Sequence, residues 1–112
     1  MNKRKALYEG MYILSASLSE ESRKKAFEKI TLGITQKGGE IHKVHEQNRR
    51  KFAYEIHHKR EGFYYVLFFS IETAAIAGLW EEYSLHEDLI RFMTLRVERV
   101  QETLDFKPLK VG

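Results

Sequence analysis

The stretch Phe63-Tyr64-Tyr65-Val66-Leu67-Phe68-Phe69-Ser70-Ile71 decides the fold of this 112-residue chain. Every residue in it except Ser70 is aromatic or aliphatic, and such residues are enriched in β-strands. Successive residues of a strand point to opposite faces of a sheet, so both faces of this strand carry large apolar side chains. The stretch therefore predicts a central strand, and the other elements are placed around it.

Three more strands are predicted along the chain. Phe52, Tyr54 and Ile56 alternate with Ala53 and Glu55, which is the period of a strand. A hairpin loop at 58–62 is expected to join this strand to the central one. The three additional strands are predicted at 7–14, 40–57 and 89–97.

Two helices are predicted between these strands, the first after residue 20 and the second at 73–83. Ser17-Leu18-Ser19-Glu20 fits a capping box, in which Ser17 and Glu20 each satisfy a backbone N–H of the other. Gly38-Gly39 is expected to end the first helix, because Gly readily adopts the left-handed conformation found at helix termini. The apolar stripes expected on the two helices are Phe27, Ile30 and Ile34, and Ile76, Leu79, Trp80 and Tyr83.

The order strand, helix, strand, strand, helix, strand predicts an α+β fold of the ferredoxin-like split βαβ type. A four-stranded sheet then carries both helices on one face, because right-handed crossovers place them there. A chain of 112 residues has room for one hydrophobic core. We therefore expect a single domain at 1–100 and a polar C-terminal tail at 101–112.

Composition and charge exclude several classes of protein. The chain has no Cys, which rules out disulfides and Cys-based zinc sites. It has no apolar run near the roughly 18 residues of a membrane span, and its N-terminus lacks the apolar region of a signal peptide. We therefore expect a cytoplasmic protein without membrane contact. The formal net charge is +3 and the pI about 9.1, and its short basic clusters are of the kind that attracts phosphate.

The face of the sheet away from the helices is predicted to be apolar and uncovered. Alternation places Met11 and Ile13 of the first strand on this face. An exposed apolar surface marks an interaction site, so we expect it to contact a protein partner. The alternative is that Leu104, Phe106 and Leu109 of the tail fold back over it. The predicted partner residues are Met11, Ile13, Tyr64, Val66, Phe68, Met93 and Leu95.

Seven basic residues are the predicted contacts to RNA phosphates. Arg49 and Arg50 lie in the long hairpin, which is expected to project from the sheet. The guanidinium of Arg is a planar fork that suits phosphate, and the Lys ammonium is a flexible point charge. Such contacts position a protein on RNA without reading its sequence. The predicted set is Lys3, Arg4, Lys5, Arg49, Arg50, Lys51 and Arg91.

Neither an enzyme nor a metal site is predicted. His42 and His45 are three residues apart in an extended stretch and point to opposite faces, and the adjacent His57 and His58 diverge in the same way. The sequence shows no zinc-ligand motif, Gly-rich phosphate loop or nucleophile elbow. The fold also hosts small phosphatases of the acylphosphatase kind, but the loop at 15–19 lacks the Arg and glycines of an anion-binding loop. We expect no cofactor and no small-molecule substrate.

One RNA-binding alternative is a module of the RNA-recognition type, which binds single-stranded RNA. The segment 61–68 partly resembles the RNP1 motif of that class, although the basic and the small residue of the motif are missing. The segment 11–14 loosely resembles RNP2. In this interpretation Phe63, Tyr65 and Tyr12 would point away from the helices and stack on bases.

Nearly the whole chain, from Lys5 to about Val97, resembles the bacterial small-subunit ribosomal protein S-six family. Arg50-Lys51-Phe52-Ala53-Tyr54 closely resembles the Arg-Arg-Leu-Ala-Tyr segment of that family. Glu55 is a departure, since Pro often follows the Ala-Tyr pair there. Other segments that resemble the family are Tyr8-Glu9, Gly38-Gly39-Glu40-Ile41-His42-Lys43-Val44, Gly62-Phe63-Tyr64 and Ile90-Arg91-Phe92-Met93.

The resemblance implies a structural role in the small ribosomal subunit and no chemistry. In that family the protein binds the central domain of 16S ribosomal RNA together with ribosomal protein S-eighteen, so the resemblance implies these two partners. It also implies that Tyr12, Tyr65, Leu67 and Phe69 face the helices, the opposite of the RNP-type assignment. A third alternative is a homo-oligomeric module that uses the apolar face of the sheet without nucleic acid.

Overall fold

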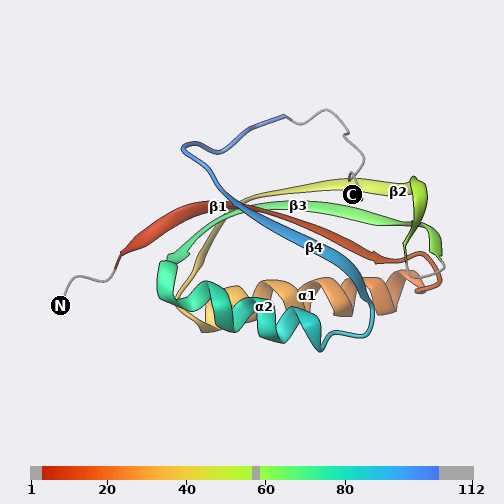
Figure 1. Ribbon diagram of the computed structural model, residues 1–112, viewed down its shortest axis with the longest axis horizontal. Coiled ribbons are helices and arrows are strands. Elements are labelled where there is room, and N and C mark those ends of the chain that lie inside the picture. Colours follow the sequence, from red (N-terminus) through yellow and green to blue (C-terminus); the bar gives the residue numbers. More distant parts are fainter. Residues whose placement is uncertain (1–3, 57–58, 104–112) are drawn as a thin grey trace.

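The computed structural model describes residues 4–56 and 59–103. The elements follow the predicted order, with a short 3₁₀ turn, η1, before the second helix (Figure 1). Their bounds are β1 Lys5–Ser15, α1 Glu20–Gln36, β2 Glu40–Ile56, β3 Lys59–Glu72, η1 Thr73–Ala75, α2 Ile76–Ser84 and β4 Leu89–Arg96.

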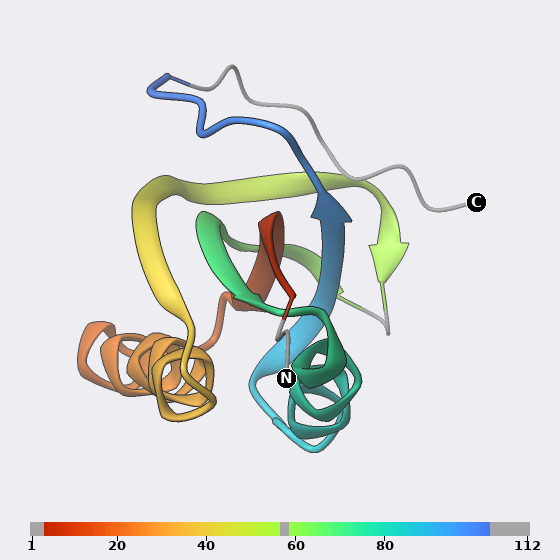
Figure 2. The ribbon, with the colours of Figure 1, turned by 90° about the vertical axis from the view of Figure 1, so that its left-hand side faces the viewer.

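The four strands form one sheet in the order β2-β3-β1-β4, and each neighbouring pair is antiparallel. Both helices lie on the same face of this sheet (Figures 1 and 2). The predicted ferredoxin-like α+β fold is therefore confirmed. The apolar stretch that begins at Phe63 lies within β3, one of the two central strands.

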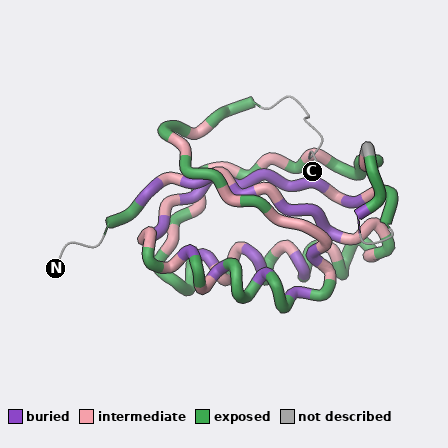
Figure 3. Tube along the Cα trace, viewed as in Figure 1, coloured by how far each residue is buried: buried purple, intermediate pink, exposed green. Residues whose placement is uncertain are grey.

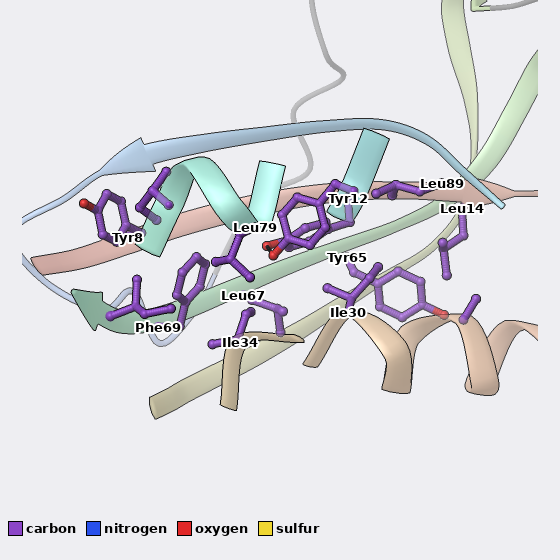
Figure 4. Packing of buried hydrophobic residues seen from close by; sticks show 14 of the residues in the cluster. Tyr8, Tyr12, Leu14, Ile30, Ile34, Tyr65, Leu67, Phe69, Leu79 and Leu89 are labelled. Atoms are coloured by element: carbon purple, nitrogen blue, oxygen red, sulfur yellow. Dashed lines mark hydrogen bonds between the residues drawn. The ribbon is translucent and has the colours of Figure 1, made fainter. Parts of the chain in front are cut away.

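The main hydrophobic core fills the space between the helices and the central strands. Tyr12 of β1 lies opposite Tyr65 of β3, and both rings point toward the helices, in one buried cluster with Ile30, Ile34 and Leu79 (Figure 4). Buried residues are concentrated along the central strands and on the inner sides of the helices (Figure 3). Tyr12, Tyr65, Leu67 and Phe69 thus face the helices, as the family resemblance implied.

The start of α1 differs from the predicted capping box. Ser19, not Ser17, is the N-cap, and its hydroxyl accepts a hydrogen bond from the backbone N–H of Ser22 at 3.1 Å. The Ser17 hydroxyl instead lies 2.8 Å from that of Ser15 at the end of β1. The helix begins two residues later than Ser17 would set it, because β1 runs on to Ser15. The predicted end is confirmed, since Gly38 has a φ of +83° just beyond the helix.

The β2–β3 hairpin and the second helix also differ in detail. The predicted loop at 58–62 is wrong, because β3 begins at Lys59, and Glu61 of β3 lies opposite Lys51 of β2 in the sheet. Positions 57 and 58 lie outside the described residues. Trp80 was predicted on the buried stripe of α2, but its ring is exposed and its indole N–H donates to the hydroxyl of Thr94 at 3.1 Å.

A buried pair of tyrosines links the sheet to α2. The hydroxyls of Tyr12 and Tyr83 are 2.9 Å apart, and their rings meet edge to face at 5.2 Å. Burial raises the pKa of Tyr83 to about 12 and raises the pKa of Tyr12 well above its usual value. Desolvation is the main cause, because it disfavours the charged phenolate.

The fold is expected to lose stability between pH 10 and about 12. Unfolded tyrosines ionise near pH 10, whereas folded Tyr83 stays neutral until about pH 12. The stabilising contribution is therefore complete below pH 10 and is lost as the pH rises, by up to about 1.4 kcal/mol per pH unit for each residue. Urea unfolding at a series of alkaline pH values measures this loss. The double variant Tyr12→Phe/Tyr83→Phe should show a shallower fall, and an equal fall would contradict the assignment.

Candidate RNA and protein interface

The face of the sheet away from the helices is less open than predicted. Four of the seven predicted partner residues, Ile13, Tyr64, Val66 and Phe68, are buried. The prediction that these four are exposed is therefore wrong. They point away from the helices as alternation required, but other parts of the chain cover them.

The distal half of β2 covers one end of this face. Phe52 and Ile56 pack with Ile13 and Tyr64 in a second, smaller hydrophobic cluster. β2 bends to reach them through irregular pairing between Glu46 and Asn48, where Asn48 has a positive φ of 63°. Such bulges increase the local bend and twist of a strand. Figure 2 shows β2 arching across the sheet on the side opposite the helices.

The chain that follows β4 crosses toward β2 on the same side of the sheet (Figure 1). The backbone oxygen of Gln101 accepts a hydrogen bond from His45 Nε2 at 2.8 Å. The carboxylate of Glu102 lies 3.3 Å from Lys43 Nζ. The His45 ring also meets Phe68 edge to face at 5.8 Å. The beginning of the predicted tail is thus attached to the sheet, while Leu104, Phe106 and Leu109 lie outside the described residues.

Two residues of the predicted partner face remain clearly exposed. Met93 and Leu95 of the edge strand β4 are 38% and 48% exposed. Met11, which lies beside Met93 in the sheet, is partly buried. The described apolar surface on this side is therefore a strip along β4 and not the whole sheet.

The predicted RNA-binding residues divide between the two ends of the sheet. Arg50 pairs with Gly62, which pairs with Ser15 at the end of β1, whereas Lys5 begins β1. Since β1 has 11 residues and a strand rises about 3.3 Å per residue, the two ends are roughly 30 Å apart. Arg4 lies with Lys5, and Lys3 lies outside the described residues.

The cluster at the hairpin end contains Arg49, Arg50 and Lys51, all of which are exposed. Arg49 forms an ion pair with Glu61, and the Arg50 Nε donates to the backbone oxygen of Gln47 at 2.8 Å. Exposed ion pairs contribute little to stability, so these side chains can exchange partners at small cost. Arg91 of β4 lies nearer this end than the other, because it pairs with Ile13.

Lys59 and Arg60 are a basic pair that the predicted set leaves out. Both are exposed at the start of β3, next to the loop that follows β1. The sequence contained the signal, two adjacent cations in the hairpin. What it did not contain was their distance from Ser15 and Ser17, which depends on the pairing of β1 with β3.

The RNP-type alternative is contradicted by the orientation of the aromatic residues. Tyr12 and Tyr65 are buried against the helices, and Phe27 stacks on Tyr65 with ring centroids 4.5 Å apart. Phe63 is partly buried, and the guanidinium of Arg23 lies 4.1 Å from its ring centroid. These rings are not available to stack on bases.

Histidines and carboxylates do not gather into a metal site in the described part of the chain. His42 is 2.6 Å from the hydroxyl of Ser70, and the buried His86 is bonded to the backbone oxygen of Ala26. Among the described residues, no helix is both long and apolar enough to cross a membrane.

The fold and the surface define a small ferredoxin-like domain with a basic hairpin end, an architecture on which nucleic-acid-binding modules are common. The chain belongs to the ribosomal protein S6 family, because the profile described as "Ribosomal protein S6" matches residues 7–96. Membership gives the chain a structural ribosomal role in a family without enzymatic activity.

Curated relatives match almost the entire chain. The "Small ribosomal subunit protein bS6" of Chlamydia pneumoniae is 55% identical over 107 residues, which is 96% of each chain. The protein of the same name from Protochlamydia amoebophila is 56% identical over 103 residues, covering 92% of this chain and 90% of that one. Their names agree with the predicted location in the small ribosomal subunit.

A solved structure matches the fold. The crystal structure of 30S ribosomal protein S6 from Thermotoga maritima superposes with a TM-score of 0.80 at 33% identity. The match covers 84% of this chain and 89% of the other. The family resemblance seen in the sequence is therefore confirmed in both sequence and structure.

Proposed function

We propose that this chain is a structural constituent of the small ribosomal subunit that binds the central domain of 16S ribosomal RNA together with ribosomal protein S-eighteen. The observation that carries the proposal is the exposed cluster Arg49–Lys51 in β2, level with the end of β1, in a chain of the ribosomal protein S6 family. These three adjacent exposed cations lie level with the end of β1 and concentrate positive charge there, which attracts phosphates.

The binding is of the phosphate-positioning kind. Arg49, Arg50 and Lys51 supply charge, whereas the rings of Tyr12 and Tyr65, which would stack on bases in an RNP-type module, are buried. Specificity then comes from the shape of the folded RNA and from the companion protein. Affinity should fall steeply with salt, because phosphate contacts release counterions.

This chain has an apolar surface that suits contact with the companion protein. Met93 and Leu95 present an exposed apolar strip on edge strand β4, with the partly buried Met11 beside it. Side chains of this kind favour burial against another protein. We assign S-eighteen to this strip and RNA to the basic hairpin.

Replacing Arg49, Arg50 and Lys51 together with Ala is expected to weaken RNA binding at least about tenfold without unfolding the protein. The three side chains are exposed, so their loss removes charge and little packing. The slope of log affinity against log salt should also fall, by about one for each phosphate that the variant no longer binds. Filter retention of central-domain RNA with S-eighteen, across a salt series, measures both quantities.

The matched control replaces Lys24, Lys25 and Lys29 of α1 with Ala, since these are also exposed and remove the same charge. This control should lose much less affinity than the hairpin variant. Equal losses would mean that overall charge, not the hairpin, drives binding. Tight binding of the wild-type protein only when S-eighteen is present supports the joint site, and no binding in either condition contradicts the proposal.

A further inference from the structure

A small hollow lies where the β1–α1 loop meets the start of β3. Its volume is about 280 Å³, just below the roughly 300–1,000 Å³ typical of small-molecule pockets. It is large enough for a single compact group. The residues that line it include Ser15, Ser17, Arg49, Lys59, Arg60 and Glu61.

The charge of the hollow favours an anion. Three of these lining side chains are cationic and one is anionic, so the lining carries 3 − 1 = +2. Glu61 is paired with Arg49, and Arg60 is 3.3 Å from Glu55 outside the lining. Lys59 has no carboxylate within ion-pair distance in the described part of the chain. Its ammonium group therefore remains to bind a ligand.

The two serines supply a hydroxyl donor. Their oxygens are 2.8 Å apart, so one hydroxyl donates its proton to the other. Whichever serine donates, the second hydroxyl still has a proton to give. The backbone N–H of Ser17 donates to the Ser15 oxygen at 3.3 Å, which helps to hold the pair at the edge of the hollow.

We propose that this hollow binds one phosphate group of the RNA backbone, held by Lys59 and Arg60 and by the free hydroxyl of the Ser15–Ser17 pair. Phosphate oxygens accept hydrogen bonds from ammonium, guanidinium and hydroxyl groups, and all three donor types meet here. The inference rests on the proposed function for its ligand. It extends the RNA-binding surface from the hairpin onto the β1–α1 loop, to residues that the predicted set does not include.

The first test needs no RNA. Inorganic phosphate is titrated into the full-length wild-type protein at constant ionic strength, with chloride as the reference anion, and backbone amide signals are followed by NMR. Saturable shifts of residues 15–17 and 59–61 with phosphate, but not with chloride, are expected. No shifts there, or the same shifts with both anions, would overturn the assignment.

The second test uses central-domain RNA with S-eighteen and the variants Lys59→Gln and Ser17→Ala. Lys59→Gln should weaken binding about three- to tenfold and reduce the salt slope by about one. Ser17→Ala should lower affinity by a smaller factor and leave the slope unchanged, because it removes no charge. Lys59→Arg should retain the wild-type slope. Lys29→Gln on α1 is the matched control and should change the slope less than Lys59→Gln.

The outcomes separate the two proposals. A wild-type protein that fails to bind RNA contradicts the proposed function. The phosphate titration then tests, independently of RNA, whether the hollow binds phosphate. If Lys59→Gln leaves the RNA salt slope unchanged, the hollow does not bind an RNA phosphate. If it instead weakens binding to S-eighteen without RNA, the hollow holds a protein carboxylate and the phosphate proposal is wrong.

Discussion

Replacing Phe68 with Ala is expected to lower the free energy of unfolding of the isolated protein by about 3–5 kcal/mol. Phe68 points away from the helices, yet only 1% of its surface is exposed. Its ring meets the edge of His45, which in turn holds Gln101. Removing the ring leaves a cavity on the side of the sheet that the sequence predicted to be open. Urea denaturation, with the slope of the transition checked for two-state behaviour, measures the change.

Leu95→Ala is the matched control for this experiment. Leu95 lies on the same face, in the neighbourhood of Glu9 and Phe68, but is 48% exposed. Its removal should cost less than about 1 kcal/mol in the free protein, because solvent already reaches much of the side chain. If both variants lose equally little stability, the face is open in solution, and the coverage by β2 and by the chain after β4 does not persist.

Gly62→Ala is expected to destabilise the protein by about 2–3 kcal/mol. A Cβ atom at Gly62 would lie 2.6 Å from Ile13 Cγ2, 2.8 Å from the backbone oxygen of Leu14 and 3.1 Å from Phe52 Cζ. The Leu14 oxygen belongs to the central strand β1 and cannot move without disturbing the sheet. The strain should also loosen the packing of Phe52 against Ile13 and Tyr64.

Gly78→Ala provides a control of opposite sign. A Cβ atom at Gly78 would meet only the flexible side chain of Lys37, at 3.6 Å, which is an ordinary van der Waals distance. Ala in a helix is favoured over Gly by about 1 kcal/mol, so this variant of α2 should be slightly more stable than the wild type. Thermal or urea unfolding of the two variants together checks the pair. A neutral Gly62→Ala would show that β1 and β3 are not so closely packed at this point.

The order of elements and the inner face of the sheet could be predicted from the sequence because both depend on local signals. The apolar run that begins at Phe63 indicates a central strand, because its side chains on both faces are apolar. Alternation with period two places Tyr65 and Val66 on opposite faces of the sheet. Gly38, with its positive φ, ends α1 as expected. The family resemblance added the choice of which face the helices cover, since alternation alone treats the two faces alike.

The predicted start of α1 was wrong because two local signals were equivalent. Ser17 and Ser19 are both good N-cap residues, and the choice depends on where β1 ends. The backbone N–H of Ser15 donates to the oxygen of Asp88 at 3.0 Å, a hydrogen bond between distant parts of the chain that extends the sheet and moves the helix start to Glu20. No pattern within the segment 15–20 contains that information.

The sequence by itself determined the strand and helix order, the ferredoxin-like topology, the core facing the helices and the basic character of the hairpin. Only the tertiary structure decided that Phe68 and its neighbours on the other face are covered, and that Lys59 lies beside Ser15 and Ser17. The physical reason is the same in both cases. Alternation says to which side a residue points, but what lies on that side depends on the bend of β2 at Asn48 and on the registers of strands that are distant in sequence.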